Sequence, residues 1–249
     1  MIALVRKLRK AMRLLADGRF RKGLLLGVAA TIEHAPVFID RHVNSIVDVG
    51  ANRGQFTLLM AGLYPDANIL AFEPLAAPFR KLVDVTADLP SVRAFNSAIG
   101  CARTTMSMNV SKRDDSSSLL PISDMQEEIF PNTGRARVDE VRVAPLADFL
   151  IDVDLKPPAL LKIDVQGFEL EVLKGSADCL ELFDAVYVEA SFVQLYNGQP
   201  FASDIIDFLH QRQFKLRGIY NLAHMSDGRA VQADFLFERR YETAETIAA

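Results

Sequence analysis

The stretch from residue 45 to residue 55, SIVDVGANRGQ, constrains the fold more than any other part of the chain. Residues 45–49 are mostly apolar and β-branched, which is typical of a buried strand. Gly50 and Gly54 then break this run, and the apolar spacing of residues 56–63 predicts a helix. A strand, a glycine turn and a helix N-terminus together point backbone N–H groups at one place. We therefore expect a ligand site here, with Asp48 accepting hydrogen bonds from an ammonium or hydroxyl group.

The following strand pattern ends in an acidic residue. Residues 68–72 are apolar and lead into Glu73, about 20 residues beyond the glycine turn, a position that suits the diol of a ribose. The alternative is an ordinary strand-to-helix turn of an α/β protein.

Strand and helix patterns alternate along most of the remaining chain. We predict strands at residues 45–49, 68–72, 92–96, 159–165 and 185–189, and helices at residues 56–63, 76–89, 146–150, 169–173 and 202–211. A final hairpin is predicted at residues 214–220 and 231–237. Such alternation predicts an α/β fold with a mostly parallel sheet, in which ligands bind outside the carboxyl ends of the strands.

Composition excludes several classes of protein. Half of the 249 residues are apolar and 24% are charged, which suits one globular domain with small appendages. The only cysteines, Cys101 and Cys179, have no Cys or His at metal-ligand spacing, so neither a disulfide framework nor a zinc site is expected. No apolar run reaches the ~18 residues that span a bilayer. We expect a cytoplasmic protein and assign no metal.

The first residues form a basic arm. Residues 1–22 carry eight Lys or Arg against one Asp, and apolar residues recur there every three or four positions, which predicts an amphipathic helix. The helix either packs on the domain or lies on an anionic membrane surface. We divide the chain into this helical arm (residues 1–40), a main domain (residues 41–240) and a tail (residues 241–249).

Residues 101–145 interrupt the alternation. Short strands are predicted at residues 104–110 and 138–143, with a polar run at residues 111–118 and a helix around residues 123–130. The excursion is too long for a plain connection, so we expect a lid over the substrate; a solvated loop is the alternative. The residues predicted to bind the polar groups of an acceptor are Asp115, Ser116, Ser117, Tyr196 and Asn197.

Charged residues also interrupt the strand at residues 159–165. Lys162, Asp164 and Gln166 share one face of a strand that should be apolar on both faces, and buried charge is costly unless it is paired or used. A structural pair between Lys162 and Asp164 is the alternative to a functional role. The candidates for a catalytic base are, in this order, Asp164, Glu189 and His224; the alternative for His224 is a solvated loop residue.

The chain resembles the FkbM family of S-adenosylmethionine-dependent methyltransferases in four segments: VDVGANRGQF, AFEP, FNSAIG and LLKIDVQGFELEVLKG. The segments DDSSSL and VYVEASFVQLYNGQPF resemble one bacterial branch of it, and the likeness covers about residues 32–237. The resemblance implies a class I methyltransferase (Rossmann-like) sheet of seven strands in the order 3-2-1-4-5-7-6, with the seventh antiparallel. It also implies S-adenosyl-L-methionine as the cofactor, and methyl transfer to a hydroxyl of a sugar, glycolipid or natural product.

The resemblance also implies roles for individual residues. Asp164 should face the sulfonium and the acceptor, and many relatives have Glu where this chain has Gln166, which removes a possible acidic contact. The residues expected at the cofactor are Asp48, Gly50, Asn52 and Gly54 for its methionine part, Glu73 for the ribose, and Ser97 and Ala98 for the adenine.

Two other functions remain open from the sequence. A nicotinamide-dependent oxidoreductase would share the strand, the turn and the distant acid, but the turn reads G-x-x-x-G and no tyrosine has a lysine four residues later. A non-catalytic module would use the basic arm to reach a membrane or a nucleic acid. The arm has no aromatic residue before Phe20, so stacking on bases is unsupported and nucleic acid is not an expected partner. A small-molecule or glycan acceptor is expected instead.

Overall fold

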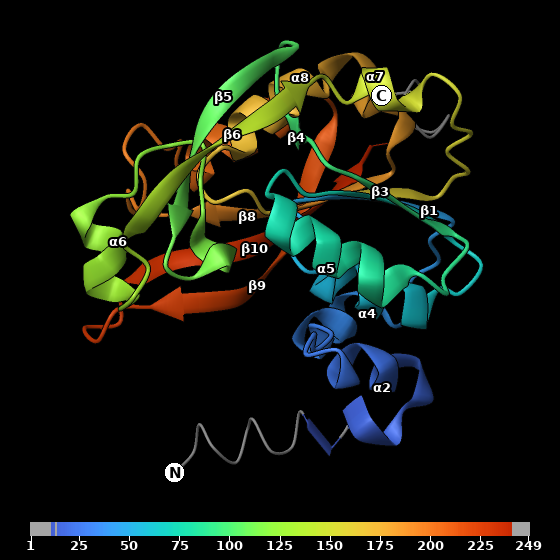
Figure 1. Ribbon diagram of the computed structural model, residues 1–249. Coiled ribbons are helices and arrows are strands. Elements are labelled where there is room, and N and C mark those ends of the chain that lie inside the picture. Colours follow the sequence, from blue (N-terminus) through green and yellow to red (C-terminus); the bar gives the residue numbers. More distant parts are fainter. Residues whose placement is uncertain (1–10, 13, 241–249) are drawn as a thin grey trace, which may run out of the picture.

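The computed structural model describes residues 11–12 and 14–240 (Figure 1). Most of the predicted amphipathic helix and the whole of the predicted tail, residues 241–249, therefore lie outside the described residues. Residues 11–12 and 14–16 are helical, and the helices α2 (Gly18–Leu25), η1 (Ile32–His34) and α3 (Ala35–Phe38) follow. Within this part, every helix is too short or too polar to cross a bilayer. The proposed division into arm, domain and tail stays a prediction.

A seven-stranded sheet forms the centre of the fold, in the order β3-β2-β1-β7-β8-β10-β9. Neighbouring strands are parallel except around β10, which runs antiparallel to both β8 and β9. With the strands of this sheet renumbered in chain order, this is the predicted order 3-2-1-4-5-7-6, and the class I methyltransferase fold is confirmed. The strands are β1 (Ser45–Val49), β2 (Asn68–Phe72), β3 (Val92–Phe95), β7 (Ala159–Ile163), β8 (Ala185–Ser191), β9 (Phe214–His224) and β10 (Ala230–Arg239).

Alternating side chains of these strands supply two hydrophobic cores. Ile46 of β1 and Leu160 of β7 face a core shared with α2, α3 and α4 (Gln55–Leu63). Val47 and Leu161, one residue further on, face the opposite core with α8 (Glu169–Gly175) and α9 (Ala202–His210). Successive strand residues point to opposite faces, so a strand that is covered on both sides is apolar throughout. The 3₁₀ helix η3 (Ala177–Leu182) and the short helix α7 (Ala147–Leu150) complete the second core. Figure 1 shows α4 and the neighbouring helix α5 (Ala76–Thr86) packed against the sheet.

The predicted excursion forms a second, smaller sheet in the order β4-β6-β5. Its elements are β4 (Ala98–Ile99), β5 (Thr104–Ser111), η2 (Asp114–Ser116), α6 (Asp124–Ile129) and β6 (Arg135–Ala144). Figure 1 shows β5, β6 and α6 in green, outside the central sheet. Each predicted strand and helix of this region is present, although β6 begins at Arg135 rather than at residue 138. The backbone bridges Asn109–Ser118 and Ile122–Tyr196 tie the excursion to itself and to the main domain.

Several strands differ in length from their predictions, and two of these differences have a local reason. The strand predicted at residues 159–165 ends at Ile163, because the chain turns there and Gln166 takes a φ of 57°. The hairpin strand predicted at residues 214–220 continues to His224, because β10 pairs with β9 as far as His224 opposite Ala230.

Candidate active site

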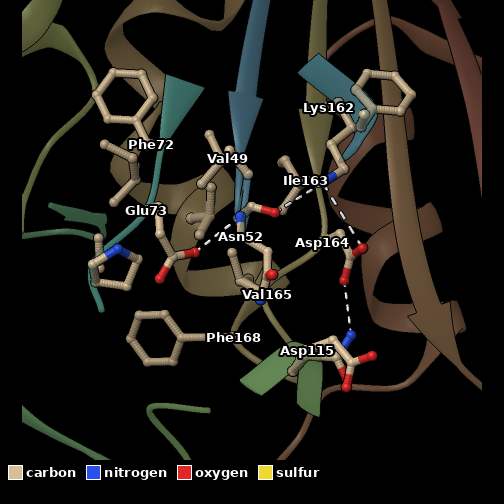
Figure 2. A pocket seen from close by; sticks show the side chains of 18 of the residues that line it. Val49, Asn52, Phe72, Glu73, Asp115, Lys162, Ile163, Asp164, Val165 and Phe168 are labelled. Carbon is tan, nitrogen blue, oxygen red and sulfur yellow. Dashed lines mark hydrogen bonds and ion pairs between the residues drawn. The ribbon is translucent and has the colours of Figure 1, made fainter. Parts of the chain in front are cut away.

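A cavity of about 250 Å³ lies at the carboxyl edge of the central sheet. Its lining reaches from Glu73, after β2, past Gly50 and Asp164 to Tyr187 in β8 and Asp234 in β10. Adjacent strands are about 4.8 Å apart, so these five strands span roughly 19 Å. Figure 2 shows Glu73 on one side of this cavity, Lys162 and Asp164 on the other, and Val165 and Phe168 between them. The cavity is thus an elongated site with two ends.

The glycine turn brings the end of β1 against the end of β7. Gly50 has a φ of 81°, and a Cβ atom built on it would lie 1.8 Å from the carbonyl oxygen of Asp164. Gly54, with a φ of 93°, is the residue before α4 and has a conformation that other residues rarely adopt. The turn is further held by N–H groups of Gly50 and Ala51, which donate to the carbonyl oxygen of Phe72 at 3.0 and 2.9 Å. A side chain at Gly50 would push the turns after β1 and β7 apart, and one at Gly54 would clash with α5.

Glu73 lines one end of the cavity and is only 4% exposed. Its Oε2 accepts the N–H of Asn52 at 3.0 Å and its Oε1 accepts the N–H of Leu75 at 2.7 Å. Burial raises the pKa of this carboxyl to about 7, although both hydrogen bonds act in the opposite direction. Each carboxylate oxygen keeps a second lone pair, so Glu73 can still accept hydrogen bonds from a ligand.

Asp48 lies beneath the cavity floor and is fully buried. Its Oδ1 is 3.0 Å from Nζ of Lys162, and its Oδ2 accepts the hydroxyl of Thr57 at 2.7 Å. Nζ of Lys162 also donates to the carbonyl oxygen of Gly50 at 3.1 Å and lies 3.8 Å from Oδ2 of Asp164. Burial alone would lower the pKa of Lys162, but the carboxylates of Asp48 and Asp164 raise it. Lys162 therefore pairs mainly with Asp48, which leaves Asp48 little capacity to contact a ligand.

Gln166 lines the cavity and joins Asp164, which also lines it, to Glu189 behind the wall. Its Nε2 donates to Oδ1 of Asp164 at 2.8 Å and to Oε2 of Glu189 at 2.9 Å, while its Oε1 accepts the hydroxyl of Tyr196 at 2.8 Å. Gln232 donates to the other oxygen of Glu189 at 2.8 Å. Burial, reinforced by the charge of Asp164, raises the pKa of Glu189 well above its usual range. A neutral amide at position 166 is thus the group that lets these two carboxyls lie close together.

The excursion closes part of the cavity. Met108, Asp114, Asp115, Ser117 and Leu119 line it from this side. The hydroxyl of Ser118 donates to the backbone oxygen of Gln166 at 2.6 Å, which fastens the excursion to the loop after β7. Asp114 is itself held by Arg53, whose Nε donates to Oδ2 of Asp114 at 2.9 Å.

The structure brings only some of the predicted site residues to the cavity. Glu189, Tyr196 and Ser116 lie behind its wall, and Asn197 and His224 are exposed elsewhere. Among the residues described, no group of three or more His, Cys, Asp or Glu side chains is arranged to hold a metal ion. The predicted residues that line the cavity are Gly50, Asn52, Glu73, Ser97, Ala98, Asp115, Ser117 and Asp164; those that do not are Asp48, Gly54, Ser116, Glu189, Tyr196, Asn197 and His224. Their roles stay predictions.

Sequence reasoning missed five polar residues of the cavity: Thr31, His34, Gln55, Tyr187 and Asp234. Asp234 interrupts the apolar run at residues 231–237, the same signal that singled out Asp164, and could have been found in this way. His34 lies in a short helical segment before the first strand, and no sequence pattern places that segment against the sheet.

Comparison with known proteins identifies relatives of this chain. A family model described as a methyltransferase FkbM domain matches residues 48–216. "Methyltransferase 1" of Beauveria bassiana is 32% identical over 181 residues, which cover 63% of this chain and 71% of the relative. "Methyltransferase sdnD" of Sordaria araneosa is 34% identical and covers 52% and 59% of the two chains. "2-O-methyltransferase NoeI" of Sinorhizobium fredii is 26% identical and covers 66% and 70%.

Proposed function

The chain belongs to the FkbM methyltransferase family, and we propose that it transfers a methyl group from S-adenosylmethionine to a hydroxyl group of a sugar, glycolipid or natural product. The choice of oxygen as the acceptor atom is supported by one relative, which is named a 2-O-methyltransferase. The observation that carries the proposal is the elongated cavity, because it can hold a cofactor at the Glu73 end and an acceptor at the Asp234 end.

The chemistry of the cavity lining fits S-adenosylmethionine, the cofactor that this family and fold imply. Carboxylates outnumber cations there, and Lys162 is already paired with Asp48, so the site suits a ligand that carries positive charge. We propose that Glu73 accepts hydrogen bonds from the ribose hydroxyls, and that the adenine lies beside Ser97 and Ala98. The carboxylates of the lining are Glu73, Asp114, Asp115, Asp164 and Asp234.

The bound cofactor supplies a methyl group on a positively charged sulfur, which an acceptor oxygen can displace in line. The chain must hold the acceptor on that line and exclude water, and alignment alone can contribute about 7–11 kcal/mol. We propose that Asp164 does part of this work, because it lies midway along the cavity and its position is set by Lys162 and Gln166.

The excursion is proposed to cover the acceptor. Asp115 and Ser117 line the cavity from this side and are its candidate polar contacts. The Oγ of Ser117 is held in place, because it already accepts the N–H of Ser111 at 3.1 Å. The buried Tyr196 supports this wall from behind, since its hydroxyl lies 3.1 Å from the backbone oxygen of Ser116.

Mass spectrometry tests the proposal directly. The protein is incubated with cofactor that carries a deuterated methyl group and with panels of polyols, glycolipids and polyketides. We expect one acceptor class to gain a single labelled methyl on oxygen. A thermal shift with NAD but none with S-adenosylhomocysteine would contradict the proposal and favour the oxidoreductase.

A further inference from the structure

Four polar side chains meet at the end of the cavity opposite Glu73. They come from η1 (His34), β8 (Tyr187), β9 (Asn221) and β10 (Asp234). Nδ1 of His34 lies 2.9 Å from the hydroxyl oxygen of Tyr187 and 3.4 Å from Oδ2 of Asp234. Asn221 donates to the same Oδ2 at 2.7 Å. The proposed binding of the cofactor uses none of these groups.

Burial makes this cluster costly unless it is paired or used. Tyr187 is 1% exposed and Asp234 is 9% exposed, and both stand in strands of the central sheet. The imidazole ring of His34 also meets Phe56 and Tyr187 edge-on, with ring centroids 5.8 Å apart in both cases. These contacts fix the plane of the ring, so its position is set by the fold.

All polar contacts of the His34 ring are on one side. Tyr187 and Asp234 approach Nδ1 with oxygen atoms, whereas Asn221 approaches it with its amide nitrogen, 3.1 Å away, which donates to Asp234. Within the part of the chain that the structure describes, no hydrogen bond reaches Nε2, although His34 lines the cavity. An imidazole with Nδ1 engaged by a carboxylate network and Nε2 free is in the state that accepts a proton.

We propose that His34 is the catalytic base of this enzyme and removes the proton of the acceptor hydroxyl at Nε2. Tyr187 and Asp234 are positioning residues that act through Nδ1. The inference rests on the proposed function. As the acceptor oxygen bonds to the methyl carbon, its O–H bond breaks and the proton moves to Nε2. The carbon–sulfur bond breaks with both electrons going to sulfur, and the proton later leaves His34 for water.

The surrounding charges favour this step. Proton transfer turns His34 into a cation, and the carboxylate of Asp234, 3.4 Å away, stabilises it. In the tautomer with its proton on Nδ1, His34 donates to the hydroxyl oxygen of Tyr187, 2.9 Å away, and Nε2 is free to accept a proton. The positive charge of Lys162 acts against the formation of a second cation at His34, but the carboxylate of Asp48 offsets this charge.

The other candidate bases are less suited to this role. Asp164 has one oxygen bound to Gln166 and faces Lys162 with the other. Glu189 is held by two amides behind the cavity wall, and His224 is exposed outside it.

The tautomer of His34 tests the inference without any acceptor. The chain has only four histidines, so ¹⁵N NMR of the imidazole nitrogens resolves each ring, and the signal lost in His34→Gln identifies this one. We expect neutral His34 to carry its proton on Nδ1, and Asp234→Asn to shift it toward Nε2. His210→Gln, which changes an exposed histidine in α9, should leave the His34 signal unchanged. A proton found on Nε2 in the native protein would overturn the inference, since that nitrogen could then only donate.

Turnover with the acceptor panel is the second test of the inference. We expect His34→Ala to lower kcat by about 10²–10⁴-fold while the Kd of S-adenosylhomocysteine stays within about twofold, and added imidazole to restore part of kcat. The base assignment would be overturned if turnover did not fall. It would also be overturned if a rise in the Kd of S-adenosylhomocysteine accounted for the whole loss of turnover. If the native protein neither binds S-adenosylhomocysteine nor methylates any member of the panel, the proposed function fails, whereas the tautomer measurement still decides the state of His34.

Discussion

Gly50 and Asp164 approach so closely that no side chain fits between them: a Cβ atom on Gly50 would lie 1.8 Å from the carbonyl oxygen of Asp164. This contact joins the turn after β1 to the turn after β7, and the two turns form adjacent walls of the cavity. Because the clash would be with backbone, it cannot be relieved by a side-chain rotation.

Gly50→Ala should therefore weaken both folding and cofactor binding. A left-handed conformation costs an alanine about 1–2 kcal/mol, and the clash adds to this. Gly198→Ala is the matched control, because Gly198 has a φ of 82° but nothing within 4 Å of its Cβ position. We expect urea denaturation to show a loss larger by about 2 kcal/mol or more for Gly50→Ala. Equal losses in the two variants would mean that the close approach contributes nothing.

The strands of the main sheet could be predicted from sequence because their signals are local. The apolar runs of β1 and β7 and the glycine turn each require only neighbouring residues to be recognised. The strand order could not be predicted in this way, because periodicity does not show which strands pair. The correct order was implied by the family resemblance. The positions of Glu73 and Asp164 at the cavity followed from the parallel sheet, whose carboxyl ends meet at one edge.

The rest of the site depends on contacts between distant segments. The sequence predicts that Tyr196 contacts the acceptor; in the structure its side chain is buried and its hydroxyl donates to Gln166, which is thirty residues away in the chain. His34 reaches the cavity only because η1 packs against β8, through the contact with Tyr187. Asp48 looked like a ligand contact, yet the nearness of Lys162 on the neighbouring strand gives it another partner. None of these pairings can be recognised from the residues that neighbour each partner in the sequence.

Asp48→Asn should destabilise the protein strongly. The change leaves the buried ammonium of Lys162 without its nearest carboxylate, and removing one partner of a buried ion pair typically costs about 3–5 kcal/mol. Asp227→Asn removes the partner of Arg229 in an exposed pair and should have little effect. The free energies of unfolding from urea titrations compare the two. If Asp48→Asn and the native protein have the same urea concentration at the midpoint of unfolding, the pair is not a stabilising element.

Tyr196→Phe should loosen the wall between the excursion and the loop after β7. The change removes the hydroxyl that bonds to Gln166 and lies near Ser116, so a buried acceptor loses its partner at a cost of about 1–3 kcal/mol. Because Gln166 also holds Asp164, we expect kcat to fall while the affinity for S-adenosylhomocysteine changes little. Tyr220→Phe deletes a hydroxyl without deleting one of these bonds and serves as the control. An unchanged unfolding free energy in Tyr196→Phe would contradict this role.

Glu73 should make the stability of the unliganded protein depend on pH. Burial raises the pKa of this carboxyl from 4.5 to about 7 in the folded state, so its protonated form is favoured by folding. Its contribution is complete below pH 4.5 and is lost as the pH rises through 7, a change of about 3 kcal/mol at 1.36 kcal/mol per pKa unit. Urea titrations between pH 5 and pH 8 should show a flatter profile in Glu73→Gln. An unaltered profile would mean that Glu73 is ionised throughout.

Binding of S-adenosylhomocysteine should depend on pH in the opposite direction. An ionised Glu73 accepts hydrogen bonds from the ribose hydroxyls, so below pH 7 the ligand must first displace a proton, and affinity should fall by up to about tenfold per pH unit. Calorimetry should show this dependence in the native protein and its loss in Glu73→Gln, together with about 10- to 100-fold weaker binding at pH 8. Glu169→Gln is the control, because burial also raises the pKa of Glu169 to about 7 but its side chain bonds to the backbone of Gly167 and does not line the cavity. That variant should alter the stability profile and leave the binding profile as it is. If both variants change binding equally, the pH dependence comes from the fold as a whole and Glu73 is not the residue that holds the ribose.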